Sequence, residues 1–161
     1  PYRRFVLSSL QRKTIESCDG RPNLLYFSGN LLSRPRRSLQ RLHNGNDIWV
    51  GTPDDMKAWR NQSDSYFDLA VESSFCAVPR GVMLGSSRLI EMMSAGCIPV
   101  ILVDGWLLPL QLTIKWNEIA VIIPEIKVLQ AAEILRNITK DAQCEMRKRM
   151  LHVYDKYLST G

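Results

Sequence analysis

The sequence predicts an α/β domain of the Rossmann-like type, in which a parallel sheet carries helices on both faces. Short apolar segments alternate with stretches of helical periodicity along the 161 residues. The apolar segments are continuous and do not alternate with polar residues, which is typical of strands buried on both faces of a sheet. No internal repeat and no linker rich in Pro, Gly or Ser divides the chain. We therefore expect one domain over residues 1–161.

The N-terminal half should contain two strands, each followed by a helix. Residues 24–27 form a short apolar run that a turn around Gly29 closes, as expected of a buried strand. Residues 36–43 have leucines three apart and stop before an Asn-Gly-Asn turn, whose residues accept the positive φ that ends a helix. Residues 47–50 predict the second strand, and apolar residues in helical order predict a helix over residues 65–73.

The C-terminal half continues the same alternation. Residues 75–78 predict a third strand, residues 86–95 a helix and residues 98–103 a fourth strand. A fifth short strand is expected at residues 120–123. Two helices should close the chain. The first of them is lined by Val128, Ala131, Ala132 and Leu135.

Charge and hydropathy restrict the partners. Lys and Arg outnumber Asp and Glu by 21 to 16, a net charge of +5 that permits an anionic ligand. The surplus is concentrated in residues 34–41 and 147–149. Aromatic residues do not interleave with these clusters, so we expect no nucleic-acid partner. No apolar run reaches the ~18 residues of a membrane-spanning helix. Because the chain begins at Pro1, we expect a piece of a longer protein with any targeting segment upstream.

The cysteines and the glycosylation signals leave the compartment open. The four cysteines form no C-x-x-C pair, which argues against a zinc site or a thioredoxin-type site. One interpretation is that the four cysteines are buried free thiols of a cytosolic domain. Two Asn-x-Ser/Thr sequons, at Asn61 and Asn137, favour the other, a secretory lumen in which both asparagines carry glycans.

Two strand-to-helix junctions carry residues suited to a phosphate ligand, which in such folds binds beyond the carboxyl ends of the strands. At the first junction, Gly29 lets the backbone approach a ligand closely. Arg36 follows in a run of arginines whose guanidinium forks match phosphate geometry. The sequence there is neither G-x-G-x-x-G nor a P-loop. An exposed basic helix face explains the same residues equally well.

The second junction is the stretch PRGVMLGSSRLIE, residues 79–91. A serine can cap the following helix, whose first N–H groups and dipole form an anion site. Arg88 can then pair with a diphosphate, and the Glu91 carboxylate can accept two hydrogen bonds from a ribose diol. The candidate nucleotide-binding residues of this junction are Arg80, Gly85, Ser86, Ser87, Arg88 and Glu91.

A plainer interpretation of Arg88 and Glu91 is a surface ion pair. An i,i+3 pair on a helix contributes roughly 0.2–0.5 kcal/mol. A capping box does not explain the glutamate, because the residues three positions beyond Ser86 and Ser87 are Leu89 and Ile90.

Longer motifs surround these residues. The stretch SSFCAVPRGVMLGSSRLIEMMSAGCIPVILVDGWLLPL occupies residues 73–110, and Trp116-Asn117 and AVIIP at residues 120–124 follow it. Upstream, residues 36–48 read RRSLQRLHNGNDI. Together these segments resemble the exostosin family of glycosyltransferases, which includes the heparan sulfate polymerases of animals and relatives in plants and algae. The resemblance runs from about Pro22 to Ser159.

The resemblance implies a GT-B glycosyltransferase, in which two Rossmann-like halves face each other across a cleft. This chain would be most of the C-terminal, donor-binding half. Arg88 falls on a position that contacts the diphosphate, Glu91 on one that contacts the ribose, and Arg36 is a second phosphate candidate. The implied reaction is an inverting transfer from a UDP-sugar to a polysaccharide or glycoprotein glycan. It needs no tightly bound cofactor and no metal at this site, and its catalytic base lies outside this chain.

The family also implies a location and partners. We expect a single-pass type II membrane protein of the Golgi lumen whose anchor lies outside this chain. A homodimer, or a heterodimer with another exostosin-like protein, is the expected assembly.

One departure from the family pattern affects the expected activity. Where the animal polymerases read Pro-Arg-Gly-Arg-Arg-Leu-Gly, this chain has Val82 and Met83 in place of two arginines. A different donor, a weakened enzyme, or a catalytically inactive domain that stabilises an active homologue would each fit. An unrelated Rossmann-like domain that binds polyanions is a further alternative.

The family pattern also suggests a disulfide between Cys76 and Cys97. Cys76 lies in one predicted strand and Cys97 just before the next, and neighbouring parallel strands would bring them together. Closing a loop of this size stabilises a fold by roughly 3 kcal/mol in the chain-entropy model. Cys18 and Cys144 remain unassigned.

Overall fold

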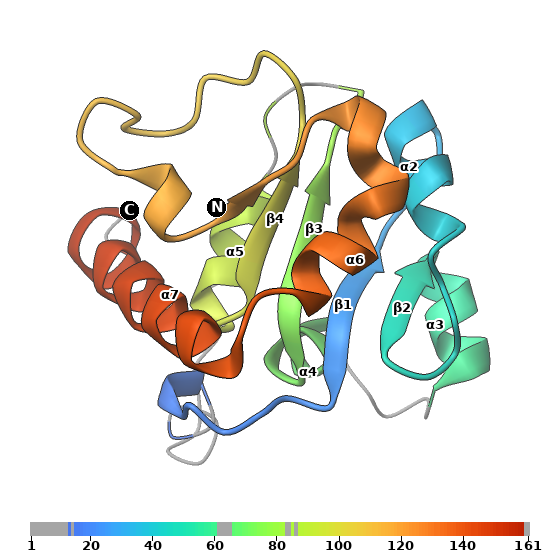
Figure 1. Ribbon diagram of the computed structural model, residues 1–161. Coiled ribbons are helices and arrows are strands. Elements are labelled where there is room, and N and C mark those ends of the chain that lie inside the picture. The colour runs from blue at the N-terminus through green and yellow to red at the C-terminus, as the bar shows by residue number, and fades with distance from the viewer. Residues whose placement is uncertain (1–12, 14, 61–65, 83–84, 86, 160–161) are drawn as a thin grey trace.

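The structure is a computed structural model that describes residues 13, 15–60, 66–82, 85 and 87–159. Within these residues, five parallel strands form one sheet in the order β2-β1-β3-β4-β5 (Figure 1). This sheet confirms the predicted Rossmann-like α/β fold. The strands are β1 (Asn23–Ser28), β2 (Ile48–Gly51), β3 (Ser73–Pro79), β4 (Ile98–Leu102) and β5 (Val121–Ile122).

Helices cover both faces of the sheet. Figure 1 shows α2 and α6 in front of the strands and α4 and α5 behind them. The strands are apolar without alternation because neighbouring residues enter opposite layers: Phe27 packs in the front core and Tyr26 in the rear one. The helices are α2 (Arg34–Gln40), α3 (Pro53–Trp59), α4 (Tyr66–Val71), α5 (Arg88–Ser94), α6 (Ala131–Arg136) and α7 (Lys140–Val153). Shorter helical turns are η1 (Trp116–Glu118), η2 (Glu125–Gln130) and η3 (Tyr154–Leu158).

The helix α3 was not among the predicted elements. The Thr52 hydroxyl accepts a hydrogen bond from the Asp55 N–H at 3.1 Å, and the Asp55 carboxylate accepts one from the Thr52 N–H at 2.7 Å. Pro53 occupies the first helical position, where its missing N–H costs nothing. This reciprocal capping was present in the sequence as Thr-Pro-Asp-Asp, a recognisable helix start.

Two other helix starts differ from the prediction. α2 begins at Arg34, ahead of the predicted residue 36, because the Ser33 hydroxyl caps it and Pro35 fits its first turn. α5 begins at Arg88, and Ser87 makes no side-chain capping hydrogen bond, so a cap by Ser87 was wrong. Ser87 has helical backbone angles, whereas a capping residue has extended ones. Ser86, the other candidate cap, lies outside the described residues.

All four cysteines form disulfides. The predicted bond between Cys76 in β3 and Cys97, next to β4, is confirmed, with Cα atoms 5.7 Å apart. A second bond joins Cys18, ahead of β1, to Cys144 in α7, with Cα atoms 5.1 Å apart. The interpretation as four free thiols was therefore wrong, because neighbouring strands and the packed α7 bring each pair within bonding distance.

Part of the basic surplus is structural. Arg147 is only 4% exposed and donates to the carbonyl oxygens of Gly96 and Ser17, both at 3.0 Å. Arg21 donates to the carbonyl of Ser73 at 3.0 Å, and burial, with a smaller contribution from Arg147, lowers its pKa to about 9. These two cations satisfy backbone carbonyls at the amino end of the sheet. The basic cluster at residues 147–149 is thus only partly available to a ligand.

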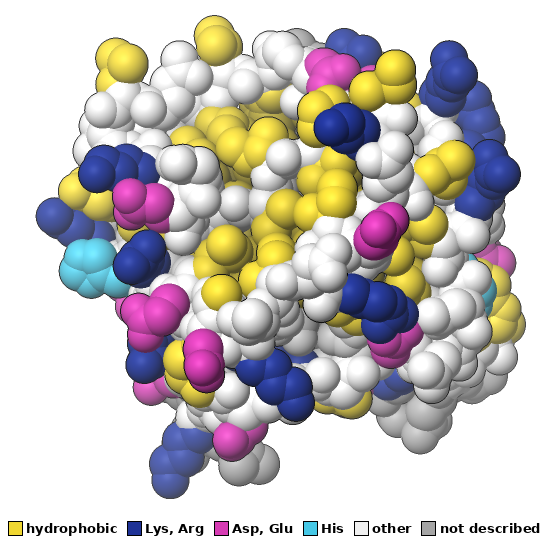
Figure 2. All heavy atoms as spheres, in the orientation of Figure 1, with side chains coloured by type: hydrophobic (Ala, Val, Ile, Leu, Met, Phe, Trp, Pro, Cys, Tyr) yellow, Lys and Arg dark blue, Asp and Glu magenta, His cyan; other side chains and the backbone are white. Residues whose placement is uncertain are grey.

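One face of the domain exposes apolar side chains. Figure 2 shows them gathered across the middle of the face that carries β5 and η2, with Lys and Arg side chains around the rim. Ile122, Ile126 and Leu129 are 50%, 90% and 47% exposed there. In the loops after β3 and β4, Val82 and Leu112 are 91% and 99% exposed. None of the helices in the described ranges is both long enough and apolar enough to cross a membrane.

Candidate functional site

The sheet changes its direction of winding between β1 and β3. From β1 the chain crosses to β2, whereas from β3 it crosses the opposite way to β4 and then β5. The loops that leave the carboxyl ends of β1 and β3 therefore diverge, and sheets of this kind bind ligands in the crevice between such loops. Both predicted phosphate-binding junctions lie on these two loops.

Hydrogen bonds join the two junctions. The Ser33 hydroxyl donates to the carbonyl oxygen of Arg80 at 2.6 Å, and Nε of Arg36 donates to the same oxygen at 3.1 Å. Ser33 and Arg36 belong to the first junction, and Arg80 begins the second. The two stretches, separated by more than forty residues, therefore lie against each other and make up one candidate site.

Arg36 is built into the base of this site. Its side chain is anchored on Asn30, donating from Nη1 to the carbonyl oxygen at 3.1 Å and to Oδ1 at 2.6 Å. The residue is 8% exposed, and burial, followed by repulsion from the Arg88 charge, lowers its pKa. The alternative of an exposed basic helix face is therefore wrong for Arg36. The acceptors that hold it are neutral, so its positive charge is not cancelled by them.

Arg88 lies beside Arg36 on the same aromatic ring. Cζ of Arg88 is 4.6 Å from the centroid of the Phe27 ring, and Cζ of Arg36 is 5.5 Å from it. Nη1 of Arg88 donates to the Tyr66 hydroxyl at 2.8 Å. Two guanidinium groups therefore converge on one ring at the carboxyl end of β1.

Gly29 is needed for this convergence. A Cβ atom at position 29 would lie 2.8 Å from Nη2 of Arg88 and 3.0 Å from Cζ of Phe27. Both distances are shorter than normal contacts. The guanidinium group of Arg88 can therefore lie this close to the turn after β1 only because residue 29 has no side chain. The sequence predicted that Gly29 lets the backbone approach a ligand; in the structure the side chain that comes close to Gly29 is that of Arg88.

Glu91 lies one helical turn beyond Arg88 and is half-buried. It acts electrostatically on the same tyrosine: burial raises the pKa of Tyr66, Arg88 opposes this rise and Glu91 adds to it. Arg88, Tyr66 and Glu91 therefore form one group at the start of α4 and α5.

The remaining predicted residues lie further from this group. Nε of Arg80 is 3.8 Å from the Glu125 carboxylate, so its guanidinium turns toward the loop after β5. That carboxylate also accepts the Asp104 N–H, while the Asp104 carboxylate accepts the Glu125 N–H, both at 3.1 Å.

Gly85 is exposed, and a Cβ added there would lie 3.7 Å from Nε1 of Trp106, an ordinary contact. Ser87 is exposed at the start of α5.

Comparison with known proteins identifies the family. A model of the Exostosin GT47 domain matches residues 1–138. The chain belongs to the exostosin GT47 family of glycosyltransferases. It is 35% identical over 162 residues to an Exostosin-1 homolog of Caenorhabditis elegans, covering 92% of this chain and 41% of that protein.

Two further relatives give the same result. Exostosin-1 of Drosophila melanogaster is 33% identical over 99% of this chain and 24% of its own length. Exostosin-1 of Bos taurus is 34% identical over 84% of this chain and 20% of its own length. The exostosin-family domain described here thus spans less than half the length of these relatives.

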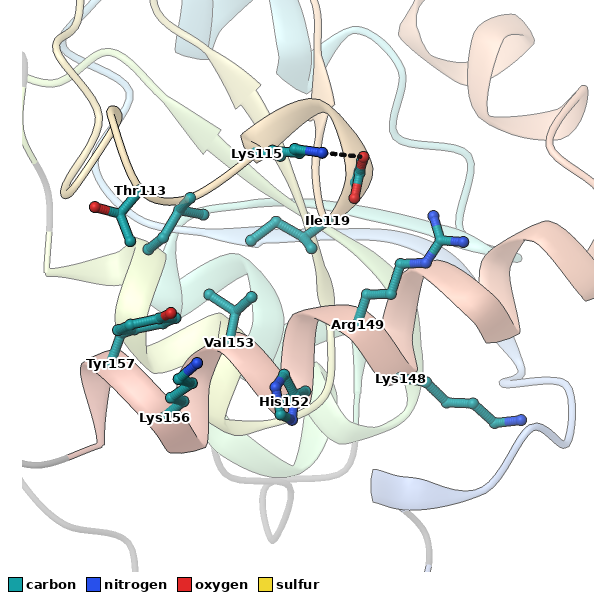
Figure 3. A pocket seen from close by; sticks show the side chains of 11 residues that line it. Thr113, Lys115, Ile119, Lys148, Arg149, His152, Val153, Lys156 and Tyr157 are labelled. Carbon is teal, nitrogen blue, oxygen red and sulfur yellow. Dashed lines mark ion pairs between the residues drawn. The ribbon is translucent and has the colours of Figure 1, made fainter.

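A separate cavity lies away from the crevice. It has a volume of about 470 Å³ and lies between η1 with its preceding loop and the α7–η3 helix (Figure 3). Lys148, Arg149 and Lys156 lie on its rim, and Lys115 pairs with Glu118 at 3.7 Å. None of the predicted site residues lines it. Its cationic side chains are solvent-exposed, so we place the candidate site of this exostosin-family domain at the crevice.

Phe27, Asn30 and Tyr66 were missed by sequence reasoning. Phe27 ends a run of apolar residues and was interpreted as part of a strand. Tyr66 precedes Phe67 at the start of a helix and carries no motif of its own. The available signal was the position of each residue near the carboxyl end of the sheet, where side chains face a ligand crevice.

Proposed function

We propose that this chain is the donor-binding part of an inverting glycosyltransferase that uses a UDP-sugar. The convergence of Arg36 and Arg88 on Phe27 at the switch point of the sheet supports this function. Neighbouring cations repel each other, and the neutral acceptors of Arg36 do not offset that repulsion. A diphosphate would offset it, because its oxygens accept charge-assisted hydrogen bonds from guanidinium groups.

Each residue has a role in the proposed mechanism. Arg88 binds the diphosphate. Arg36, which is buried near the same Phe27 ring, raises the positive electrostatic potential at the diphosphate. As the bond between sugar and diphosphate breaks, negative charge builds on the leaving group, and guanidinium groups fixed in advance stabilise it. This removes the need for a metal ion at the diphosphate. Glu91 accepts hydrogen bonds from the two ribose hydroxyls, and the base that activates the acceptor lies outside this chain.

The exposed apolar surface supports a second half in the parent protein. Leu107, Leu112 and Ile126 are 75%, 99% and 90% exposed on loops that follow β4 and β5. Large exposed apolar patches mark interaction surfaces. We propose that the other Rossmann-like half of a GT-B enzyme faces these loops and contributes the acceptor-glycan site and the base. Pairing with another exostosin-like protein is a further part of the proposal.

The two disulfides support a lumenal location, because such bonds persist in oxidising compartments. We propose the Golgi lumen, with a type II membrane anchor outside this chain. Asn137 is exposed in the turn between α6 and α7, where a glycosylating enzyme can reach its sequon. Asn61, the other predicted glycan site, lies outside the described residues.

Calorimetric titration of the protein with UDP tests the site. Arg88→Ala should weaken UDP binding by about tenfold or more, since hydrogen bonds to charged groups contribute about 1.5–3 kcal/mol. Glu91→Ala should weaken UDP and uridine alike, because the ribose is common to both. Arg149→Ala, on the distant cavity, is the matched control and should bind normally. Binding that is unchanged in both Arg88→Ala and Glu91→Ala would contradict the assignment.

A second candidate function is a catalytically inactive domain that stabilises an active homologue. Val82, 91% exposed in the loop after β3, favours it, because the animal polymerases have a charged residue there. An exposed valine cannot contact a phosphate through charge. Met83, at the second substituted position, lies outside the described residues. UDP binding without sugar transfer by the parent protein, together with increased activity of a co-expressed homologue, would support this candidate.

A further inference from the structure

We infer that Tyr66 is a positioning residue for the nucleotide diphosphate, acting by orienting the guanidinium group of Arg88. This inference rests on the proposed function, in which Arg88 binds the diphosphate. Tyr66 begins α4 and Arg88 begins α5, so the two residues come from different helices behind the sheet. Their side chains meet at the carboxyl end of β1.

Contacts with Tyr66, Phe27 and the turn at Gly29 orient the guanidinium group. Nη1 of Arg88 donates to the Tyr66 hydroxyl at 2.8 Å. Cζ of Arg88 lies over the Phe27 ring, 4.6 Å from its centroid, and is 5.5 Å from the centroid of the Tyr66 ring. Nη2 lies so close to Gly29 that a Cβ there would be 2.8 Å away. A guanidinium group held by these contacts is oriented before the ligand arrives.

A tyrosine has an advantage over a carboxylate in this position. A carboxylate would neutralise the arginine and compete with the diphosphate for it. A phenol accepts one N–H and does not itself neutralise the guanidinium group, which keeps N–H donors for a phosphate oxygen. Burial raises the pKa of Tyr66 above its ordinary value, so the phenol stays neutral at physiological pH.

Tyr66 is itself held by packing. Its ring centroid is 6.0 Å from that of Tyr26, at an interplanar angle of 58°. Tyr26 is 1% exposed in the rear core, which makes it a rigid neighbour. The chain of contacts from the core through Tyr26 and Tyr66 to Arg88 limits the rotamers that Arg88 can adopt. Such advance ordering strengthens binding by reducing the entropy lost when the ligand binds.

The test is a double-mutant cycle on the protein, measured by calorimetry with UDP and with uridine. Tyr66→Phe keeps the ring and removes the hydroxyl. It should weaken UDP binding by about fivefold, the effect expected of one hydrogen bond. Uridine lacks the diphosphate, so its affinity should stay unchanged. In the Arg88→Ala background, Tyr66→Phe should have no further effect on UDP.

A matched control separates positioning from folding. Tyr157→Phe removes the same hydroxyl beside the distant cavity and should leave both affinities unchanged. An equal loss of UDP and uridine affinity in Tyr66→Phe would show a merely structural role and overturn the inference. A fivefold loss that persists in the Arg88→Ala background would overturn it too.

The failure of the proposed function has a different signature. If the wild-type protein binds no UDP, or Arg88→Ala binds it normally, the proposed function fails and this inference falls with it. If Arg88→Ala loses UDP binding and Tyr66→Phe keeps it, the proposed function stands and only the role of Tyr66 is overturned.

Discussion

At the scale of single residues, the site depends on side chains that hold other side chains. Arg36 was predicted as a phosphate ligand, yet its hydrogen bonds go to Asn30 and to the carbonyl of Arg80. Arg36 joins the loops that follow β1 and β3, and its positive charge contributes to the electrostatic potential of the site. Arg88 depends in the same way on Tyr66, Phe27 and the absence of a side chain at position 29. The proposed recognition surface therefore depends on residues that need not touch the ligand.

Replacing Gly29 by alanine tests this dependence. The closest atom to the new Cβ, Nη2 of Arg88, ends a flexible side chain, and the Phe27 ring at 3.0 Å needs to move by only a few tenths of an ångström, so the fold can adapt by displacing Arg88. We expect the free energy of unfolding to change by no more than about 1 kcal/mol. UDP binding should fall by about tenfold, because the guanidinium group leaves its ordered position. Calorimetry and denaturant unfolding measure the two effects.

The control for this substitution is Gly20→Ala, where the new Cβ would meet Nζ of Lys140 at an ordinary 3.5 Å. Both quantities should stay near their wild-type values. Normal UDP binding by Gly29→Ala would show that Arg88 does not need the space at this turn.

At the scale of elements, an ion pair fixes the far edge of the sheet. Arg136 in α6 donates to both carboxylate oxygens of Asp47, at 2.8 and 3.0 Å, just before β2. The hydrogen bonds from Arg136 are the main cause of a lowered pKa for Asp47. A bidentate pair of this kind holds its geometry better than a single contact. It ties the last turn of α6 to the edge strand on the front face.

This pair predicts a pH-dependent contribution to stability. A carboxyl whose pKa is lowered by folding stabilises the fold above its unfolded pKa, about 3.9, and that stabilisation is lost as pH falls through the folded pKa. Asp47→Asn should therefore lower the free energy of unfolding by about 0.5–1 kcal/mol at pH 7. The difference from wild type should shrink as the pH falls below about 4. Denaturant unfolding across this pH range measures it.

Asp54→Asn is the comparison variant, because Asp54 has a 93% exposed side chain and pairs with Lys57 only at 3.7 Å. Its stability should differ little from wild type at any pH. A constant difference between Asp47→Asn and wild type down to low pH would show that the ion pair does not carry the effect.

At the scale of the whole molecule, the sequence predicted the layers of the fold better than the contacts within the site. Continuous apolar runs give buried parallel strands, and these put Gly29 directly after β1 and Arg88 at the start of the helix that follows β3. The pairing of Cys76 with Cys97 follows from the adjacency of β3 and β4. Tyr66 was unpredictable because its contact with Arg88 depends on how α4 and α5 pack, which no local pattern specifies. Helix α3 was predictable in principle, since its capping residues were present.

Cys18 and Cys144 could not be paired from sequence, because 126 residues separate them and no spacing rule applies. Their bond closes almost the entire described chain, whereas the bond between Cys76 and Cys97 lies inside the core, with both residues fully buried. In the chain-entropy model the first contributes about 5 kcal/mol and the second about 3 kcal/mol. Reducing agent should therefore shift the unfolding midpoint strongly.

The surroundings of the two bonds predict a further difference. Replacing Cys76 and Cys97 by serine should cost about 1–3 kcal/mol more than replacing them by alanine, because serine buries hydroxyl groups in an apolar core. At Cys18, which is exposed, and Cys144, which is half-buried, serine and alanine pairs should differ by less than about 0.5 kcal/mol, since water can reach the hydroxyl groups. Denaturant unfolding of the four double variants measures both differences. If the serine and alanine pairs differ in free energy of unfolding by the same amount at both sites, the Cys76–Cys97 bond is as accessible to water as the Cys18–Cys144 bond.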